Sequence, residues 1–250
     1  KENGKNNQMQ KSKIKITNYD VFENGRIKLS SILRYMQELA REDSDACGAT
    51  YELLRSHNMV FVITKLALEF HGDIYDGDEI ELSTCSHSIQ GVTFVRRFVA
   101  TKGEETVMTA VTDWVLMNFE SRHVLRPAAI PVPFPEEHML EAPIEVKRRI
   151  ELPDTTEYAV HRVRYTELDE NRHLNNTVYA DIMIDNLPLP IPDKRIDRCC
   201  INFNGEACYG DELHVTCKFC DGVYLSAAEN VTGGKQCYTA ELTFAGGNNA

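Results

Sequence analysis

Hydrophobic and polar residues follow two different periods along this chain. A helical period begins at residue 29, where the hydrophobic positions are Leu29, Ile32, Leu33, Met36, Leu39 and Ala40. This spacing predicts an amphipathic helix with one buried face. The stretches around it are rich in β-branched and aromatic residues and are separated by Gly- or Asp-containing turns, which predicts strands. The predicted strands cover residues 13–16, 60–69, 79–86, 93–100 and 108–118.

The same order of elements recurs in the second half of the chain. Residues 158–165 predict a strand, and residues 177–187 predict a helix that ends before Pro188, since proline cannot continue a helix. Four more strands are predicted at residues 198–204, 212–219, 224–229 and 237–244. Each half therefore predicts one strand, one helix and then four strands.

A sequence repeat supports duplication of this unit. The segment EFHGDIYDGDEI at residues 69–80 and the segment NFNGEACYGDEL at residues 202–213 share Phe, two Gly, Asp and Glu at equivalent positions. Such agreement is unlikely by chance and indicates an internal repeat. We therefore expect an N-terminal unit at residues 13–130, a proline-rich linker at residues 131–150 and a C-terminal unit at residues 151–245.

The most unusual polar segment, LDENRHLNN at residues 168–176, directly precedes the second predicted helix. If it is extended, Asp169, Asn171 and His173 alternate onto one side. They would then lie beside the free N–H groups of the helix start, which can stabilise a developing oxyanion. Alternatively, Asn175 or Asn176 caps the helix and the other polar residues form turns. That alternative leaves His173 unexplained, so we favour a functional role.

A second candidate is Glu206, which aligns with Asp73 in the repeat. A carboxylate held beside a turn with hydrophobic neighbours can act as a base toward water, although a solvated surface residue is the simpler interpretation. In place of the Asp169–His173 run the first copy has residues 24–28, NGRIK, with neither a histidine nor a carboxylate. We therefore predict that only the second copy carries out chemistry.

Composition limits the classes of function. The net charge of −11 disfavours binding to nucleic acid or to an anionic membrane. No hydrophobic run reaches the length of a membrane span, and the polar start lacks the hydrophobic core of a signal peptide, so we predict a cytoplasmic location. The single C-x-x-C, Cys217 to Cys220, has no second pair to complete a zinc site. We expect reduced thiols, no metal and no cofactor.

The polar motif resembles that of a known enzyme family. The run Asp169-x-Asn171-x-His173, followed by Asn175, Asn176 and Tyr179 and then by Glu206, is similar to that of bacterial and plant plastid acyl-acyl-carrier-protein thioesterases. Trp114 to Met117 and the basic stretch from Ser121 to Pro127 also resemble this family. The resemblance implies an α+β tandem double hot-dog fold, in which each unit is a curved antiparallel sheet wrapped around a long helix.

The resemblance also implies a reaction. Members of the family hydrolyse the thioester between a fatty acyl chain and the phosphopantetheine arm of the carrier protein, which gives free fatty acid and holo carrier protein. The family's catalytic residues match Asp169, Asn171, His173 and Glu206. We expect Glu206, assisted by His173, to activate water, while Asn171 and helix-start N–H groups stabilise the oxyanion and Asp169 orients Asn171 or His173. Which of Glu206 and His173 is the principal base is left open.

One departure from the family affects the mechanism. Many plant members have a cysteine directly after the glutamate, where this chain has Ala207. The next residue, Cys208, would point to the opposite face of a strand from Ala207. We therefore favour attack by water over attack by a cysteine.

The remaining predictions concern the substrate. We expect the first copy to hold the acyl chain, with Asn175 and Asn176 also in contact with substrate; for any single hydrophobic candidate, ordinary core packing is the alternative. The predicted lining residues are Met36, Leu39, Met59, Phe61 and Ile63. Because carrier proteins of this kind are acidic, a basic patch should dock them. The candidate docking residues are Arg162, Arg164, Arg172, Lys194, Arg195 and Arg198.

Two rival functions remain open at this point. An acyl-coenzyme A thioesterase of the same fold would use a similar site. A non-catalytic acyl-thioester sensor would not need the four polar residues together and would normally carry a basic DNA-binding segment. A double hot-dog already contains the pair that single hot-dog proteins form by dimerising, so both a monomer and a homodimer are compatible with the sequence.

Overall fold

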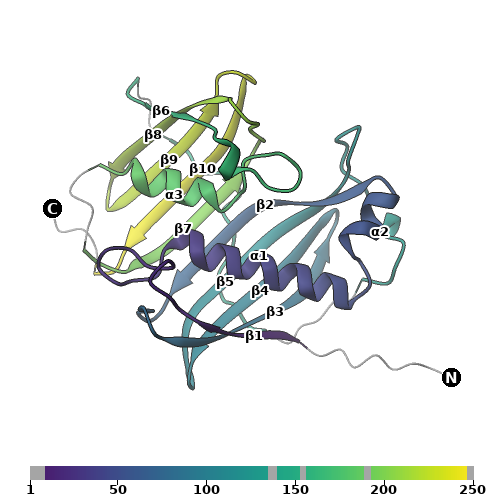
Figure 1. Ribbon diagram of the computed structural model, residues 1–250, viewed down its shortest axis with the longest axis horizontal. Helices are drawn as coiled ribbons and strands as arrows, with labels where there is room; N and C mark the ends of the chain where they lie inside the picture. The colour runs from purple at the N-terminus through teal and green to yellow at the C-terminus, as the bar shows by residue number, and fades with distance from the viewer. Residues whose placement is uncertain (1–8, 135–139, 153–155, 189–192, 247–250) are drawn as a thin grey trace.

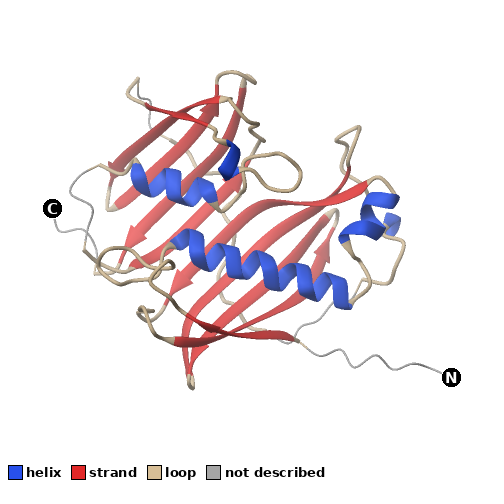
Figure 2. Ribbon diagram, in the orientation of Figure 1, coloured by secondary structure: helices blue, strands red, loops and turns tan. Residues whose placement is uncertain are grey.

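The computed structural model describes residues 9–134, 140–152, 156–188 and 193–246. Within these residues ten strands form one antiparallel sheet in the order β1-β3-β4-β5-β2-β7-β10-β9-β8-β6. The helices α1 (Leu29–Ala46) and α3 (Val178–Asp185) lie against the same face of the sheet (Figures 1 and 2). The strands are β1 Gln10–Lys15, β2 Met59–Phe70, β3 Glu79–Gln90, β4 Thr93–Lys102, β5 Glu105–Asn118, β6 Ala159–Arg162, β7 Ile196–Phe203, β8 Glu212–Cys220, β9 Val223–Asn230 and β10 Lys235–Phe244.

The predicted repeat is confirmed by the order of the elements. Each half has one strand, a helix that packs on the sheet and then four strands, with one additional short helix (Tyr51–Ser56) in the first half, and the strands take the same order, β1-β3-β4-β5-β2 and β6-β8-β9-β10-β7. The aligned turns are also equivalent. Gly77 N–H donates to the carbonyl of Ile16, and Gly210 N–H donates to that of Val163, each at 3.0 Å. Both glycines have a positive φ, +85° and +84°, which a glycine adopts without steric cost.

The two halves join through their sheets. Strand β2 pairs with β7 in antiparallel register from Lys65 opposite Asn202 to Glu69 opposite Arg198. On the helix-free face, hydrophobic residues of the predicted linker pack over this junction. Leu140 is buried nearby, and Ala142, Ile144 and Ile150 form a cluster with Ala67, Val95, Val111 and Cys200. Residues 142–150 of the predicted linker therefore cover part of the outer face of the sheet.

The helices differ in length and in what they cover. The 18-residue α1 buries its predicted face, including Ile32, Met36 and Leu39, against the first half of the sheet. The 8-residue α3 is shorter than the predicted 177–187 helix, and its buried Tyr179 packs on Tyr238 of β10, with ring centroids 5.2 Å apart. No helix in the described parts of the chain has the length and hydrophobicity to cross a membrane.

The sequence did not predict the short helix α2 (Tyr51–Ser56). Its N-cap is Thr50, whose hydroxyl oxygen accepts the N–H of Leu53 at 3.2 Å. Six residues are too few for a helical period to be visible in the sequence. Strand β6 is likewise shorter than predicted, with four residues instead of the eight expected at 158–165.

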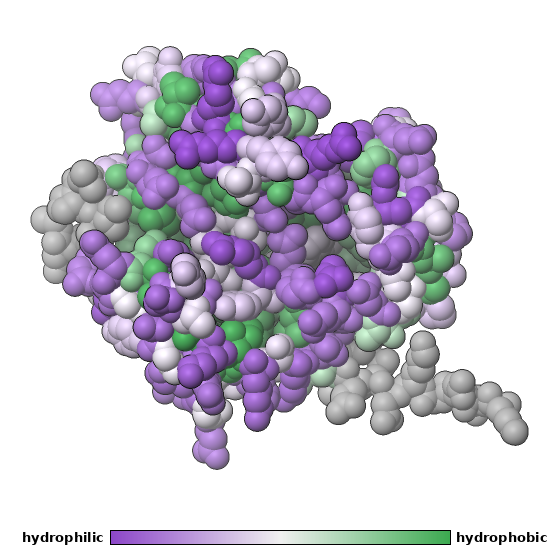
Figure 3. Space-filling view, in the orientation of Figure 1, coloured by the Kyte–Doolittle hydropathy of each residue, from purple (hydrophilic) through white to green (hydrophobic). Residues whose placement is uncertain are grey.

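The face that carries both helices is mostly hydrophilic, and its hydrophobic residues form separate small groups (Figure 3). A cavity lies inside the first half.

Candidate functional site

The polar segment before α3 is a tight turn, so the prediction that it is extended is wrong. Asp169 N–H donates to the carbonyl of His173 at 2.8 Å, and residues 168 and 174 form an isolated bridge. Asp169 Oδ1 accepts the backbone N–H groups of Asn171 at 2.8 Å and of His173 at 3.0 Å. Arg172 closes the turn at φ +65°. Asp169 thus positions Asn171 and His173 through the backbone, and the two side chains leave the turn toward different partners.

The structure brings His173 and Glu206 together. Leu174 N–H donates to the carbonyl of Ala207 at 2.7 Å, and this bond aligns the turn with the segment that follows β7. His173 Nε2 then lies 3.5 Å from Glu206 Oε2. Two residues predicted from distant parts of the sequence therefore form a pair.

Arg122 is a third member of this group, and the sequence analysis did not single it out. Its guanidinium contacts Glu206 Oε1, on the other side of the carboxylate from His173. Arg122 comes from the turn after β5 in the first half, where its N–H donates to the carbonyl of Asn118 at 3.0 Å. Each carboxylate oxygen of Glu206 therefore has its own partner, one from each half of the chain.

The surroundings of His173 favour its neutral form. Burial lowers the pKa of His173, and the positive charge of Arg122 lowers this pKa further, while the negative charge of Asp169 acts in the opposite direction. A histidine with a pKa below its usual value is neutral at pH 7 and can accept a proton.

The two residues after Glu206 do not favour a cysteine nucleophile. Ala207 is fully buried, and Cys208 is exposed on the opposite side. Partial burial of the thiol and the nearby negative charge of Asp211 raise the pKa of Cys208, although the residue as a whole is exposed. The reactive thiolate is therefore disfavoured at neutral pH.

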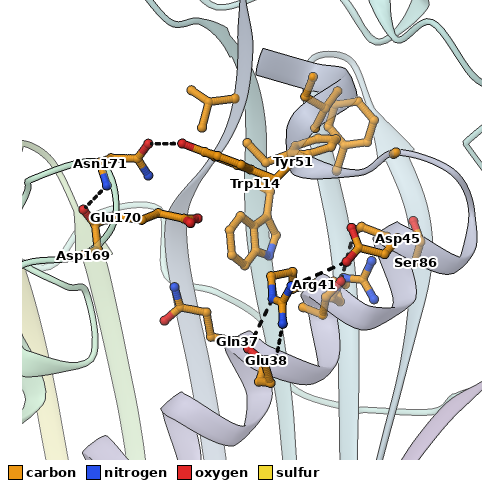
Figure 4. Close-up of a pocket in the computed structure, with 18 of the residues that line it drawn as sticks. Gln37, Glu38, Arg41, Asp45, Tyr51, Ser86, Trp114, Asp169, Glu170 and Asn171 are labelled. Atoms are coloured by element: carbon orange, nitrogen blue, oxygen red, sulfur yellow. Dashed lines mark hydrogen bonds and ion pairs between the residues drawn. The ribbon is translucent and has the colours of Figure 1, made fainter. Parts of the chain in front are cut away.

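Asn171 points the other way, toward the first half of the chain. The hydroxyl of Tyr51, in the first turn of α2, donates to Asn171 Oδ1 at 3.0 Å (Figure 4). The side-chain nitrogen of Asn171 is then the end of the amide that can donate to a substrate carbonyl. Tyr51 was missed because it lies in the short helix that the sequence did not reveal.

The start of α3 does not offer the free donors that we expected there. Asn175 Oδ1 accepts both the N–H and the hydroxyl of Thr177 at 2.9 Å, and the Asn175 carbonyl accepts the N–H of Val178 at 2.9 Å. These two N–H groups already have partners, but the N-cap of α3 is Thr177, so the interpretation that Asn175 or Asn176 caps the helix is wrong; Asn175 instead forms a turn just before it. Asn171 is left as the candidate oxyanion donor.

A cavity of about 730 Å³ lies in the first half, between α1, α2 and the strands β2 to β5. Asp169 and Asn171 form part of its wall from the second half (Figure 4), and so does Asn175. Its hydrophobic wall includes Ala40, Ala49, Leu54, Val60, Phe61, Phe94 and Trp114. The cavity therefore opens toward the turn that carries the polar motif.

The predicted lining residues are only partly correct. Phe61 lines the large cavity, whereas Met36, Ile63 and Asn176 line a separate space of about 40 Å³, which also borders on Trp114. Leu39 is buried in the main core under α1, and Met59 packs against a cluster around Phe94. The candidates on α1 and β2 face different spaces, which only the tertiary structure separates.

The six predicted docking residues do not form one patch. Arg162 ends β6 and lies 3.7 Å from Glu212 at the start of β8, whereas Arg198 on β7 pairs with Thr243 near the end of β10. These positions are on the opposite outer strands of the second half and at opposite strand ends. Arg164 and Arg172 lie at the same strand ends as Arg162 and Glu206. Lys194 and Arg195 lie at the opposite strand ends, together with Arg198.

The described residues contain no group of three or more His, Cys, Asp or Glu side chains with the geometry to hold a metal ion.

Comparisons with known proteins agree with this architecture. Residues 7–129 match the acyl-ACP thioesterase N-terminal domain, and residues 150–244 match the acyl-ACP thioesterase C-terminal domain. The chain is 25% identical over 203 residues to oleoyl-acyl carrier protein thioesterase 1, chloroplastic, from Arabidopsis thaliana, a match that covers 73% of this chain. That match includes 56% of the Arabidopsis protein, so the chain spans about half the length of this relative.

Solved structures confirm the predicted double hot-dog fold. An acyl-ACP thioesterase from Bacteroides thetaiotaomicron superposes with a TM-score of 0.85 at 20% identity and covers 94% of this chain and 97% of its own. The 12:0-ACP thioesterase from Umbellularia californica superposes with a TM-score of 0.78 at 17% identity and covers 96% and 98%. With both family domains matched in tandem, this chain belongs to the acyl-ACP thioesterase family.

Proposed function

We propose that this protein hydrolyses the thioester between a fatty acyl chain and acyl carrier protein. The observation that carries the proposal is the arrangement around one turn. His173 leaves the turn toward Glu206, and Asn171 leaves it toward a cavity with a largely hydrophobic wall. A thioester carbonyl at Asn171, with its acyl chain in the cavity, would lie between an oxyanion donor and a base.

The proposed reaction uses water as the nucleophile. Neutral His173 takes a proton from water, and the water oxygen attacks the thioester carbon while the side-chain nitrogen of Asn171 donates to the carbonyl oxygen. Glu206, held by Arg122 on its other oxygen, stabilises the imidazolium that forms. When the C–S bond breaks, the departing thiolate takes the proton from His173. The lowered pKa of His173 supports its assignment as the proton acceptor, with Glu206 as its partner.

The proposed docking surface is the group at the site end of the second half, Arg162, Arg164 and Arg172. These side chains are exposed at the same strand ends as Glu206, so a carrier protein held there could deliver its arm to the turn. An acidic partner gains from such a basic group even though the whole chain is negative. A cytoplasmic location and the choice between monomer and homodimer stay predictions.

The test is hydrolysis of matched acyl chains presented on carrier protein and on coenzyme A. We expect turnover of acyl-carrier protein by the wild type and loss of turnover in His173→Ala and Glu206→Ala. Turnover of the coenzyme A substrate alone would replace the proposal with an acyl-coenzyme A thioesterase. Binding of either thioester without turnover by the wild type would favour a sensor.

A further inference from the structure

An ion pair is buried inside the half that we propose holds the acyl chain. Arg96 lies on β4 between the buried rings of Phe94 and Phe98, and only 5% of it is exposed. Its Nη1 donates to Oδ2 of Asp43 on α1 at 2.6 Å, and Asp43 is 7% exposed. Burying such a pair costs free energy unless its hydrogen bonds are satisfied, and hydrophobic residues of similar volume often serve stability as well. A site for a plain hydrocarbon chain gives no reason to keep it.

The pair contributes directly to the wall of the cavity. Arg96 lines the cavity, and so does Ser86, its cross-strand partner on β3, which is 2% exposed. Among the described residues, both hydrogen bonds of Arg96 start from Nη1, to Asp43 and to Thr84 Oγ1 at 3.3 Å. Nε and Nη2 of Arg96 and the hydroxyl of Ser86 therefore supply buried polar groups on the cavity wall, whereas other charged residues of the wall, such as Glu38 and Arg41, have more than half of their side chains exposed.

These groups lie far from the proposed reaction centre. In Figure 4 Asn171 and Ser86 are on opposite sides of the cavity with Trp114 between them. In the sheet, β4 and β3 are the second and third strands from β2, the strand that joins the second half. At the usual spacing of about 4.8 Å between strands, this separation corresponds to on the order of ten carbons of an extended acyl chain.

We propose that the inner end of the cavity binds an oxygen atom carried by the distal part of the acyl chain, as a hydroxyl or keto group. This inference rests on the proposed function and names its substrate class. A saturated chain that reached Arg96 and Ser86 would displace water from them without replacing its hydrogen bonds. An oxygen at that depth accepts a hydrogen bond from the guanidinium, and a few well-placed polar groups in a hydrophobic pocket give a ligand its specificity.

The experiment compares carrier proteins loaded with matched chains. One chain is saturated, and the others carry a single hydroxyl or keto oxygen at successive distal carbons. We expect at least one distal position to raise kcat/KM roughly tenfold or more over the saturated chain, as a hydrogen bond to a charged group would give. Asp43→Leu with Arg96→Met replaces the pair by hydrophobic residues of similar size. This double variant should abolish the preference, measured as the ratio of kcat/KM for the oxygenated chain to kcat/KM for the saturated chain. Ser86→Ala should reduce it.

The control replaces the exposed Lys11–Glu81 ion pair, as K11M/E81L, and should leave the ratio unchanged. If the D43L/R96M variant fails to fold, the wild-type ratio and the S86A variant still decide the question. If saturated chains are hydrolysed as efficiently as every oxygenated chain, this inference is overturned and the proposed function is left intact. An oxygen preference that survives in D43L/R96M would also overturn it. Failure of all thioesters to react would instead reject the proposed function.

Discussion

The two halves of this chain hold equivalent turns with different chemistry. In the second half, Asp169 N–H donates to the carbonyl of His173 at 2.8 Å, and His173 faces Glu206. In the first half, Phe22 N–H donates to the carbonyl of Arg26, also at 2.8 Å. Arg26 Nε lies 3.1 Å from Asp73, the residue that aligns with Glu206 in the sequence repeat. An arginine–aspartate pair therefore occupies the place of the histidine–glutamate pair.

This difference shows what the fold supplies and what the side chains must add. Arginine stays protonated at any physiological pH and cannot take a proton from water. Arg26 also has a second anionic partner, Asp193 at 3.0 Å. The same backbone frame thus gives an ion pair that links segments of the chain in one half and a proton acceptor in the other.

The interiors of the two halves also differ, and here it is the first half that has the feature needed for function. The first half holds the large cavity, whereas in the second half Tyr179 of α3 packs on Tyr238 of β10, whose hydroxyl lies 2.9 Å from that of Ser226. Among the described residues, the large cavity therefore lies in the half with the ion pair, and the half with the acid–base pair has aromatic rings in its core. Each half has what the other lacks, which is the basis of the division of labour proposed here.

The largest predicted effect separates the two equivalent pairs. His173→Gln and Glu206→Gln should each lower kcat by about 100- to 10,000-fold, because proton transfer by a positioned group is worth that much. The matched changes Arg26→Gln and Asp73→Asn should leave kcat within about twofold and cost about 1 kcal/mol or less in stability, since their ion pair is partly exposed. Steady-state kinetics and denaturant unfolding of all four variants check this. Equal losses of activity in both halves would refute the division.

The second prediction concerns the contact between the halves. Tyr51→Phe removes the hydrogen bond that orients Asn171 and should lower kcat about tenfold, with little change in KM, because a modest loss of alignment in the transition state costs about 1.4 kcal/mol. The control is Tyr19→Phe on the exposed surface. A rise in KM at constant kcat would mean that Tyr51 serves only the cavity.

The third prediction uses pH. His173 must be neutral to accept a proton, and its pKa lies below the usual value of about 6.5, so activity should be full at pH 7 and decline as the pH falls through that lowered pKa. Arg122→Gln removes a positive charge and should raise the pKa of His173, so the decline moves to higher pH. Glu206 and Asp169 are the anions that face this histidine. A pH–rate profile that Arg122→Gln leaves unmoved would argue against His173 as the acceptor.

The smallest of these effects distinguishes the two basic groups. Charge reversal at Arg164 and Arg172 should raise KM for acyl-carrier protein several-fold at low salt, and the increase should shrink as salt screens the charges. Reversal at Lys194 and Arg198, at the other end of the sheet, should change KM little. A larger rise in KM from reversal at Lys194 and Arg198 would place the docking surface at their end of the sheet and contradict the proposal.

The sequence predicted the repeated unit and the pairing of His173 with Glu206 better than the details between them. The helical period of α1 and the aligned Gly77 and Gly210 turns depend on local patterns, which a sequence displays directly. The turn at 169–173 was only the alternative interpretation of the sequence, because its left-handed residue is Arg172, whereas the equivalent position in the first half is Gly25.

Other site residues depend on long-range packing. Tyr51 reaches Asn171 from a six-residue helix, and Arg122 reaches Glu206 across the two halves. The docking residues were grouped by their proximity in sequence, but strand order places Arg162 and Arg198 at opposite ends. Residues that meet only through strand register cannot be recognised from one sequence.

The most direct test of the division of labour is to measure binding and cleavage separately in two variants. Glu206→Gln should bind acyl-carrier protein with an unchanged Kd and cleave it at least about 100-fold more slowly in a single turnover. Phe61→Trp, which fills part of the cavity, should weaken binding of long acyl chains and leave the single-turnover rate at saturation close to the wild-type rate. If Glu206→Gln cleaves at the wild-type rate, or if Phe61→Trp abolishes cleavage without affecting binding, the assignment of chain binding to the first half and hydrolysis to the second is wrong.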